Sequence, residues 1–248
     1  LEVNNGTGFI EGGAFGVGQL APSRMEVGQP IGYFFGYVTD GIFQNGGEIE
    51  AHPSQAALGA EAQPGDLRFV DINGDGVIDT EDRTNIGNPI PDYTMGLNLS
   101  FEYKGFDALV YTFASLGNEM VRNYERALSD VNRLDYYLER WTGEGSTNEV
   151  PRVTTAATSN LVFSDFFVED ASFVRIQNVQ LGYTFPLRFM SNKNSTLRVY
   201  ASANNLLTFT GYRGFDPAAS NGAPIGGGID FGFYPIPRIY MIGANLNL

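Results

Sequence analysis

The chain has 248 residues, with 28 acidic and 15 basic side chains and a net charge of -13. This balance argues against nucleic acid as a partner, because phosphate binding needs clusters of Lys and Arg and the sequence contains none. Cysteine is absent, which excludes disulfides and thiolate metal sites. The 31 glycines, 19 phenylalanines and 13 tyrosines favour strands and turns over helices.

The N-terminal stretch, residues 1–29, is Gly-rich and polar, and its apolar residues are too scattered to predict more than a broken strand or two. The chain opens without Met and without a basic segment followed by an apolar run, so we expect a mature or internal fragment of a longer protein. No run of about 18 apolar residues occurs, which excludes a membrane helix. A membrane β-barrel is compatible with the sequence, because its alternating strands give only a weak hydropathy signal.

An aromatic-rich run begins at Pro30 and predicts a strand up to about Val38, followed by a turn at residues 40–41. The Gly, Pro, Ala and Glu content of residues 44–66 predicts a loop. This loop opens a long connection, 44–92, which also contains an acidic segment.

The acidic segment, 71–82, has the spacing of a calcium-binding loop. Side chains with oxygen atoms occupy positions 1, 3, 5, 9 and 12, and position 6 is Gly76, where such a loop turns sharply. We therefore predict a structural calcium ion with these ligands: Asp71, Asn73, Asp75, Val77 through its carbonyl, Asp79 and Asp82. The usual loop ends in a bidentate Glu, so an Asp there predicts a looser cage or one completed by water. The alternative is a set of acidic turns that binds no metal.

The clearest element is the segment 93–103, in which apolar residues alternate strictly with small or polar ones. Its length matches that of a tilted strand crossing a bilayer, and aromatic residues stand at both ends, as in interfacial girdles. Lys104 and Gly105 predict a tight turn into a second strand, 106–115, where apolar residues at alternate positions share one face.

A long excursion, 117–170, comes next, with one short helix predicted over 130–141 from apolar residues at helical spacing. Alternating patterns then predict strands over 172–185 and 196–206, and a last strand over 240–248.

Long and short connections alternate along the chain. The long connections are 44–92, 116–171 and 207–237, and the short ones are 104–105 and 186–195. Outer-membrane barrels have this asymmetry, with short periplasmic turns and large external loops, so we expect the acidic segment outside the cell. A secreted, calcium-stabilised β-sandwich that binds carbohydrate is the alternative, because it would show the same alternation.

The residues do not predict an enzyme. The single histidine, His52, falls in a predicted loop, which gives no support to Ser-His-Asp chemistry. A glycoside hydrolase needs two carboxylates that face one cleft at a defined separation, and the sequence shows no pair placed in this way.

From Gly28 to the end, the segments follow one another in the order and spacing of a known family. They are GQPIGYFFGYVTDGIFQ, PGDLRFVDINGDGVIDTEDRTNIGNPIPDYTMGLNLSFEYKGFD, RW, PR, FVRIQNVQLGYTFP, LRVYASANNLLTFTGYRGFDP and YPIPR. The chain thereby resembles the C-terminal part of a SusC/RagA-type TonB-dependent outer-membrane transporter of Bacteroidetes. The resemblance implies an all-β fold in which residues 30–248 are the C-terminal portion of an antiparallel transmembrane β-barrel of about 22 strands. The plug and N-terminal domains of that family are absent from the sequence.

The resemblance implies TonB-driven import of glycan oligosaccharides or peptides, with TonB engaged through the missing N-terminal part. It also implies outer-membrane lipid around the barrel and a SusD-like surface lipoprotein as its lid. Contact with ligand or lid is expected from these residues of the long loops, since aromatic faces suit sugar stacking: Tyr136, Tyr137, Trp141, Tyr212, Phe215 and Asp216. The alternative for Trp141 is that it packs its own loop.

Overall fold

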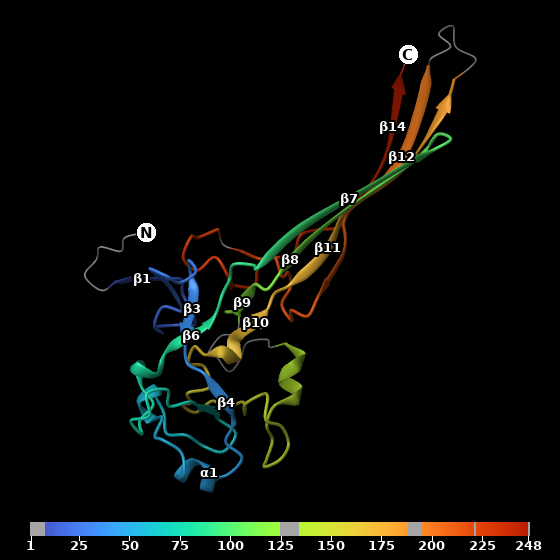
Figure 1. The fold of residues 1–248 in the computed structure, drawn as a ribbon. Coiled ribbons are helices and arrows are strands. Elements are labelled where there is room, and N and C mark those ends of the chain that lie inside the picture. Colours follow the sequence, from blue (N-terminus) through green and yellow to red (C-terminus); the bar gives the residue numbers. More distant parts are fainter. Residues whose placement is uncertain (1–7, 125–133, 188–194, 221, 248) are drawn as a thin grey trace. The chain divides into compact units, whose positions relative to one another are not determined.

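The computed structural model describes residues 8–124, 134–187, 195–220 and 222–247 (Figure 1), and its fold is all-β with few helices. Two compact units make up the chain. The loop unit comprises Leu1–Ile90, Glu119–Glu169 and Ala219–Phe233, and the sheet unit comprises Pro91–Asn118, Asp170–Ala218 and Tyr234–Leu248. Among the described residues, no helix combines the length and the apolar character needed to cross a membrane.

The sheet unit contains a five-stranded antiparallel sheet in the order β14-β12-β11-β8-β7 (Figure 1). Its strands are β7 (Tyr93–Tyr103), β8 (Phe106–Leu116), β11 (Phe173–Pro186), β12 (Thr196–Thr210) and β14 (Ile239–Asn247). The strand predicted over 93–103 is confirmed with the same bounds. Lys104 and Gly105 form the predicted turn with φ of 47° and 87°, because positive φ at both positions matches the twist of the flanking strands. The strand predicted to end at 206 continues to Thr210.

The register of this sheet separates an apolar face from a polar face, because residues paired across strands point to the same side. One rung of the apolar face runs across all five strands through Leu99, Val110, Val179, Ala203 and Tyr240. A neighbouring rung of the polar face runs through Asn98, Tyr111, Asn178, Asn204 and Ile239. On that face the Asn178 amide donates to the Asn204 side-chain oxygen at 2.6 Å.

The apolar residues of β8 that were predicted to share one face lie on the polar face of the sheet. Leu109 is paired with Ser100, and Tyr111 with Asn98, so these alternating residues share one face as predicted, but not the face of the apolar residues in β7. The two-residue turn fixes this register, since Tyr103 pairs directly with Phe106.

The loop unit consists of short elements. Its four-stranded sheet has the order β1-β2-β3-β6, with β1 (Phe9–Gly12), β2 (Ser23–Glu26), β3 (Tyr33–Gly36) and β6 (Thr84–Gly87). Two smaller sheets are formed by β4 (Thr39–Ile42) with β5 (Leu67–Phe69), and by β10 (Val168–Asp170), β9 (Glu119–Arg122) and β13 (Ile229–Asp230). Its helices are α1 (Gly46–Glu50) and the 3₁₀ helices η1 (Ala56–Leu58), η2 (Thr80–Asp82), η3 (Asp135–Glu139) and η4 (Asp165–Phe167).

Two predictions about the loop unit are wrong in detail. Residues Asp40 and Gly41 do not end a strand; they lie inside β4, where Gly41 has φ of 79° and the pairing with β5 is irregular. Of the helix predicted over 130–141, residues 130–133 lie outside the described residues, and the rest forms the 3₁₀ helix η3. Tyr136 and Tyr137, adjacent in the sequence, are both buried in this short helix.

The predicted loops of this unit pack around buried side chains. One cluster contains Tyr37, Ile42, Leu67, Phe69 and Ile78. A second cluster contains Phe15, Phe34, Val121, Phe163, Phe167 and Ile229. Residues far apart in sequence therefore form a common core, and the long connections 44–92 and 116–171 are compact segments with buried side chains.

Candidate ligand-contact sites

The carboxylates of the acidic segment accept hydrogen bonds from its own backbone. Asp71 accepts from the N–H groups of Gly74 and Gly76 at 2.6 and 2.8 Å. Asp75 accepts from Val77 N–H at 2.9 Å, while its own N–H donates to the Asn73 side-chain oxygen at 2.9 Å. The segment is thus wound into a tight loop by its predicted ligands.

Asp82, the last predicted ligand, is fully buried and serves the backbone of the loop. It accepts from the N–H groups of Ile72 and Asp79, each at 2.8 Å. Asp79 accepts from Glu81 N–H at 2.8 Å and caps the helix η2.

The donor types of the loop fit calcium, which prefers carboxylate, amide and carbonyl oxygens. Within the described ranges, no group of three or more His, Cys, Asp or Glu side chains is placed to hold a metal ion. The loop therefore has the composition and the turn of a calcium site without converged carboxylates, and calcium binding stays a prediction.

Tyr136 and Tyr137 are buried in the loop unit. Their rings lie 4.5 Å apart and pack with Val150. The Tyr136 hydroxyl accepts from the guanidinium of Arg122, which is itself fully buried. Both tyrosines therefore have a packing role, and ligand contact through them stays a prediction.

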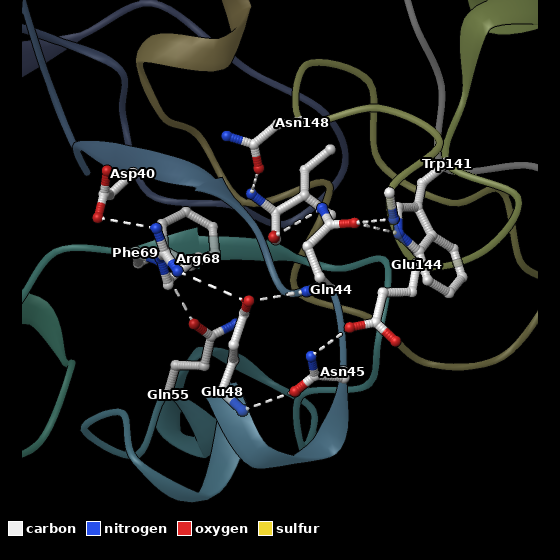
Figure 2. Close-up of polar contacts among 12 residues, drawn as sticks. Asp40, Gln44, Asn45, Glu48, Gln55, Arg68, Phe69, Trp141, Glu144 and Asn148 are labelled. Atoms are coloured by element: carbon white, nitrogen blue, oxygen red, sulfur yellow. Dashed lines mark hydrogen bonds and ion pairs between the residues drawn. The ribbon is translucent and has the colours of Figure 1, made fainter.

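Trp141 packs within its own unit, beside Gln44 (Figure 2). Its indole N–H donates to the Gln44 side-chain oxygen at 3.2 Å, and its ring lies against Gly65, where a Cβ atom would clash with it. Gln44 also accepts from Gly145 N–H at 2.9 Å and donates to the Thr147 carbonyl at 3.0 Å. Gln44 thereby ties the segment after Trp141 to the end of β4.

An open groove of about 540 Å³ lies beside this contact. Its lining residues come from three stretches of the chain: Ile42, Gln44, Glu48, Arg68, Glu144, Gly145, Thr147 and Asn148. Arg68 donates to Asp40 at 3.0 Å and lies 3.6 Å from Glu48 (Figure 2). Sequence reasoning missed the groove, because no local spacing signals that these three stretches meet.

Asp216 is buried in the sheet unit and forms an ion pair with Arg175 at 2.6 Å. Burial alone would raise the pKa of Asp216, but hydrogen bonds from Ala218 N–H, Arg175 and Ile236 N–H outweigh it and lower the pKa below its ordinary value. Tyr212 is also buried, with its ring lying against Gly214. Phe215 is 59% exposed, which makes it the member of the predicted contact set most accessible in this chain.

Comparison with known proteins gives no match to a family model. Among curated proteins, the chain is 35% identical over 232 residues to TonB-dependent receptor P3 of Formosa agariphila, covering 90% of the chain and 22% of that receptor. It is 30% identical to TonB-dependent receptor P26 of the same organism, over 90% of the chain and 23% of that receptor. It is 29% identical to TonB-dependent receptor SusC of Bacteroides thetaiotaomicron, over 77% of the chain and 18% of that receptor.

Solved structures of RagAB have the same fold. The peptide importer RagAB in its 'open-open' state matches with a TM-score of 0.67 and 25% identity, over 92% of this chain and 23% of that one. The RagAB peptide transporter matches with a TM-score of 0.69 and 23% identity, over 98% of this chain and 24% of that one.

In both sequence and fold, the chain is similar to a segment of TonB-dependent receptors. Among these receptors the chain is similar to those of the SusC/RagA type, so the predicted resemblance is confirmed. The chain spans about a fifth of the length of the curated receptors it matches, 22% and 23% for the two from Formosa agariphila.

Proposed function

We propose that the chain is a C-terminal part of the barrel wall in a TonB-dependent importer of the outer membrane. The observation that carries this proposal is the sheet of the sheet unit, which has one apolar face, one polar face and two outer strands, β7 and β14. Its strands are 9 to 15 residues long. A tilted strand needs about 9–11 residues to cross a bilayer, so each of the five is long enough.

The two faces match the two solvents of a barrel wall. Leu97, Leu99 and Phe101 of β7 are more than half exposed on the apolar face, where they would contact lipid. Asn178, Gln180 and other polar residues of the opposite face would line a hydrated lumen. The strands β7 and β14 end the sheet, and unpaired backbone groups in a bilayer cost several kcal/mol each, so we expect further strands of the same protein to close a barrel of about 22.

The long connections would then be extracellular, with the acidic segment among them. We propose that they face a SusD-like lipoprotein lid and an oligosaccharide or peptide ligand, while TonB acts through the part of the protein that precedes this segment. The likeness to SusC and to the RagAB peptide importer supports this assignment. We further propose that a structural calcium ion occupies the acidic segment, because its donor types and its glycine turn fit that ion.

The test is extraction of the full-length protein from its native outer membrane in mild detergent, followed by intact mass analysis of what co-purifies. A polypeptide several times longer than this chain, travelling with a lipoprotein, is the expected result. A stable species near 27.1 kDa that stays soluble without detergent would support the calcium-stabilised sandwich and overturn the barrel assignment.

A further inference from the structure

The loop unit contains a small pocket that is separate from the groove beside Trp141. Its volume is about 230 Å³, which is the liquid volume of about seven water molecules. Three stretches of the chain supply its apolar lining: Leu20, Ala57, Leu58 and Val162. Three residues with polar side chains also line it: Tyr37, Thr80 and Arg83. The pocket therefore combines an apolar wall with one charged and two hydroxyl-bearing residues.

Arg83 is buried but uses only part of its hydrogen-bonding capacity. Its side chain is 5% exposed, and Nη2 donates to the carbonyls of Ala21 and Phe35, each at 2.7 Å. The other two nitrogens, Nε and Nη1, have no hydrogen-bond partner among the described residues. A guanidinium that is largely removed from water needs acceptors for its N–H groups, so this arrangement is costly. An acceptor inside the pocket would remove that cost.

The charge of Arg83 is only weakly compensated. In the part of the chain that the structure describes, its one ion pair is with Glu11, whose carboxylate lies 3.9 Å from Nη1. The same Glu11 oxygen accepts from Nε and Nη2 of Arg24 at 3.1 and 3.0 Å, so it is more strongly engaged by Arg24. Two guanidinium groups thus share one carboxylate oxygen, and a second carboxylate beside Arg83 would gain a charge-assisted hydrogen bond.

Tyr37 supplies a second donor to the pocket. Its ring packs against that of Phe69, with 5.8 Å between the ring centres, and its hydroxyl has no hydrogen-bond partner within the described ranges. Burial raises the pKa of Tyr37, so the hydroxyl is protonated at neutral pH and can donate to an anion. The charges of Asp79 and Asp82 also act on this hydroxyl. Because they repel negative charge, they disfavour an anion that carries two charges.

We propose that this pocket binds a monocarboxylate with a short alkyl chain, such as butyrate. The carboxylate would accept hydrogen bonds from Arg83 and Tyr37, and the alkyl chain would pack against the apolar wall, which includes Leu58 and Val162. All the residues that line the pocket belong to the loop unit. The inference therefore does not depend on the proposed import function.

The first experiment is equilibrium dialysis of the full-length protein, in mild detergent at neutral pH, against radiolabelled butyrate. We expect saturable binding with a Kd of about 0.1–10 mM, as is reasonable for a ligand of this size. Butyramide has nearly the same shape but no charge, and it should compete at least about tenfold more weakly. Sulfate carries two charges and no alkyl chain, and it should also compete at least about tenfold more weakly.

Three results of this dialysis would overturn the inference. The first is the absence of saturable butyrate binding. The second is equal competition by butyramide, which would show that the charge of Arg83 is not recognised. The third is equal competition by sulfate, which would show that neither the alkyl chain nor the single charge matters.

A second experiment locates the bound butyrate with variants of the full-length protein. Tyr37→Phe keeps the ring and removes the hydroxyl, and it should weaken butyrate binding about tenfold. Ala57→Phe places a ring at the exposed rim of the pocket and should abolish binding. Arg83→Gln is less informative, because Nη2 of Arg83 also holds two backbone carbonyls and the variant can fail to fold.

Tyr33→Phe is the matched control for Tyr37→Phe. It also removes one tyrosine hydroxyl from the loop unit, but that hydroxyl donates to Glu26, and Tyr33 does not line the pocket. The Kd for butyrate should stay at the wild-type value in this variant. Equal affinities of Tyr37→Phe and Tyr33→Phe, or wild-type binding by Ala57→Phe, would show that butyrate binds elsewhere and would overturn the assignment.

Discussion

The two units satisfy the hydrogen-bonding groups of their backbones in different ways. In the sheet unit, long ladders pair nearly every residue of β11 with β8 and β12, and side chains simply alternate between two faces. In the loop unit, the described strands have at most four residues. There, single buried polar side chains make the hydrogen bonds that hold neighbouring segments together. We therefore expect the folding free energy to be distributed evenly along the strands of the sheet unit and to depend on a few buried residues in the loop unit.

Asp66 is the main such residue. It is fully buried and accepts from both Arg152 nitrogens, at 2.7 and 3.1 Å, and from the side chains of Thr158 and Asn160. Asp66→Ala should destabilise the loop unit by about 3–5 kcal/mol, because it leaves Arg152 without its counter-charge. Limited proteolysis of the full-length protein in detergent should then cut this unit faster while the sheet unit stays intact.

Asp40→Ala is the control for that change, since Asp40 forms an exposed ion pair with Arg68. Its expected cost is about 0–1 kcal/mol. Equal proteolysis rates for the two variants would contradict the idea that stability is concentrated at buried polar residues.

In the sheet, the face decides the cost of a charge. Leu181→Lys places an ammonium on the apolar face, where we expect a loss of about 2–4 kcal/mol in folding free energy in a bilayer. Gln180→Lys, one residue away on the polar face, should change it by less than about 1 kcal/mol. Urea titration of the transporter refolded into lipid vesicles measures both, and equal losses would remove the assignment of lipid to the apolar face.

Gly182 makes room for an ion pair that crosses the middle strand β11. Arg198 of β12 donates to Asp107 of β8 at 2.9 Å, and a Cβ atom at Gly182 would lie 2.5 Å from the Asp107 carboxylate. Gly182→Ala should therefore cost about 1–3 kcal/mol. Gly96→Ala is the comparison, because its Cβ would come no nearer than 3.4 Å to a neighbour, and the same titration should show a smaller loss.

The smallest expected effect is a pH dependence in the loop unit. Burial and the hydrogen bond to Glu26 raise the pKa of Tyr33 to about 12 from 10.0. Since the folded pKa is raised, the contribution of Tyr33 is fully present below pH 10.0 and is lost as the pH rises towards 12. Tyr33→Phe should cost about 0.5–1.5 kcal/mol at neutral pH and remove the rise in proteolysis rate that we expect between these pH values in the wild type. An unchanged pH profile in the variant would contradict this role.

The same contrast explains what could be predicted from the sequence. The strand β7 was predicted with its bounds because apolar residues alternate strictly with small or polar ones along it, and this local period is visible in the sequence. The contact between Trp141 and Gln44 joins residues 97 apart and leaves no local period. The turn predicted at Asp40 and Gly41 is wrong, because Gly41 lies inside β4 and its missing side chain lets Asn148 approach the strand closely.

The candidate sites also differ in whether a local sequence pattern reveals them. The acidic segment was visible because its residues are consecutive and their spacing is itself the signal. The pairing of Asp216 with Arg175 was not visible, since 41 residues separate them.

The most direct test of the barrel wall is cysteine scanning along β7, since this chain contains no cysteine of its own. Single substitutions from Leu97→Cys to Phe101→Cys in the full-length transporter, in native outer membranes, are treated with a water-soluble maleimide. The account predicts strong labelling at Asn98 and Ser100, on the polar face, and weak labelling at Leu97, Leu99 and Phe101, on the face towards lipid. Equal labelling at all five positions would contradict the claim that this sheet separates lipid from lumen.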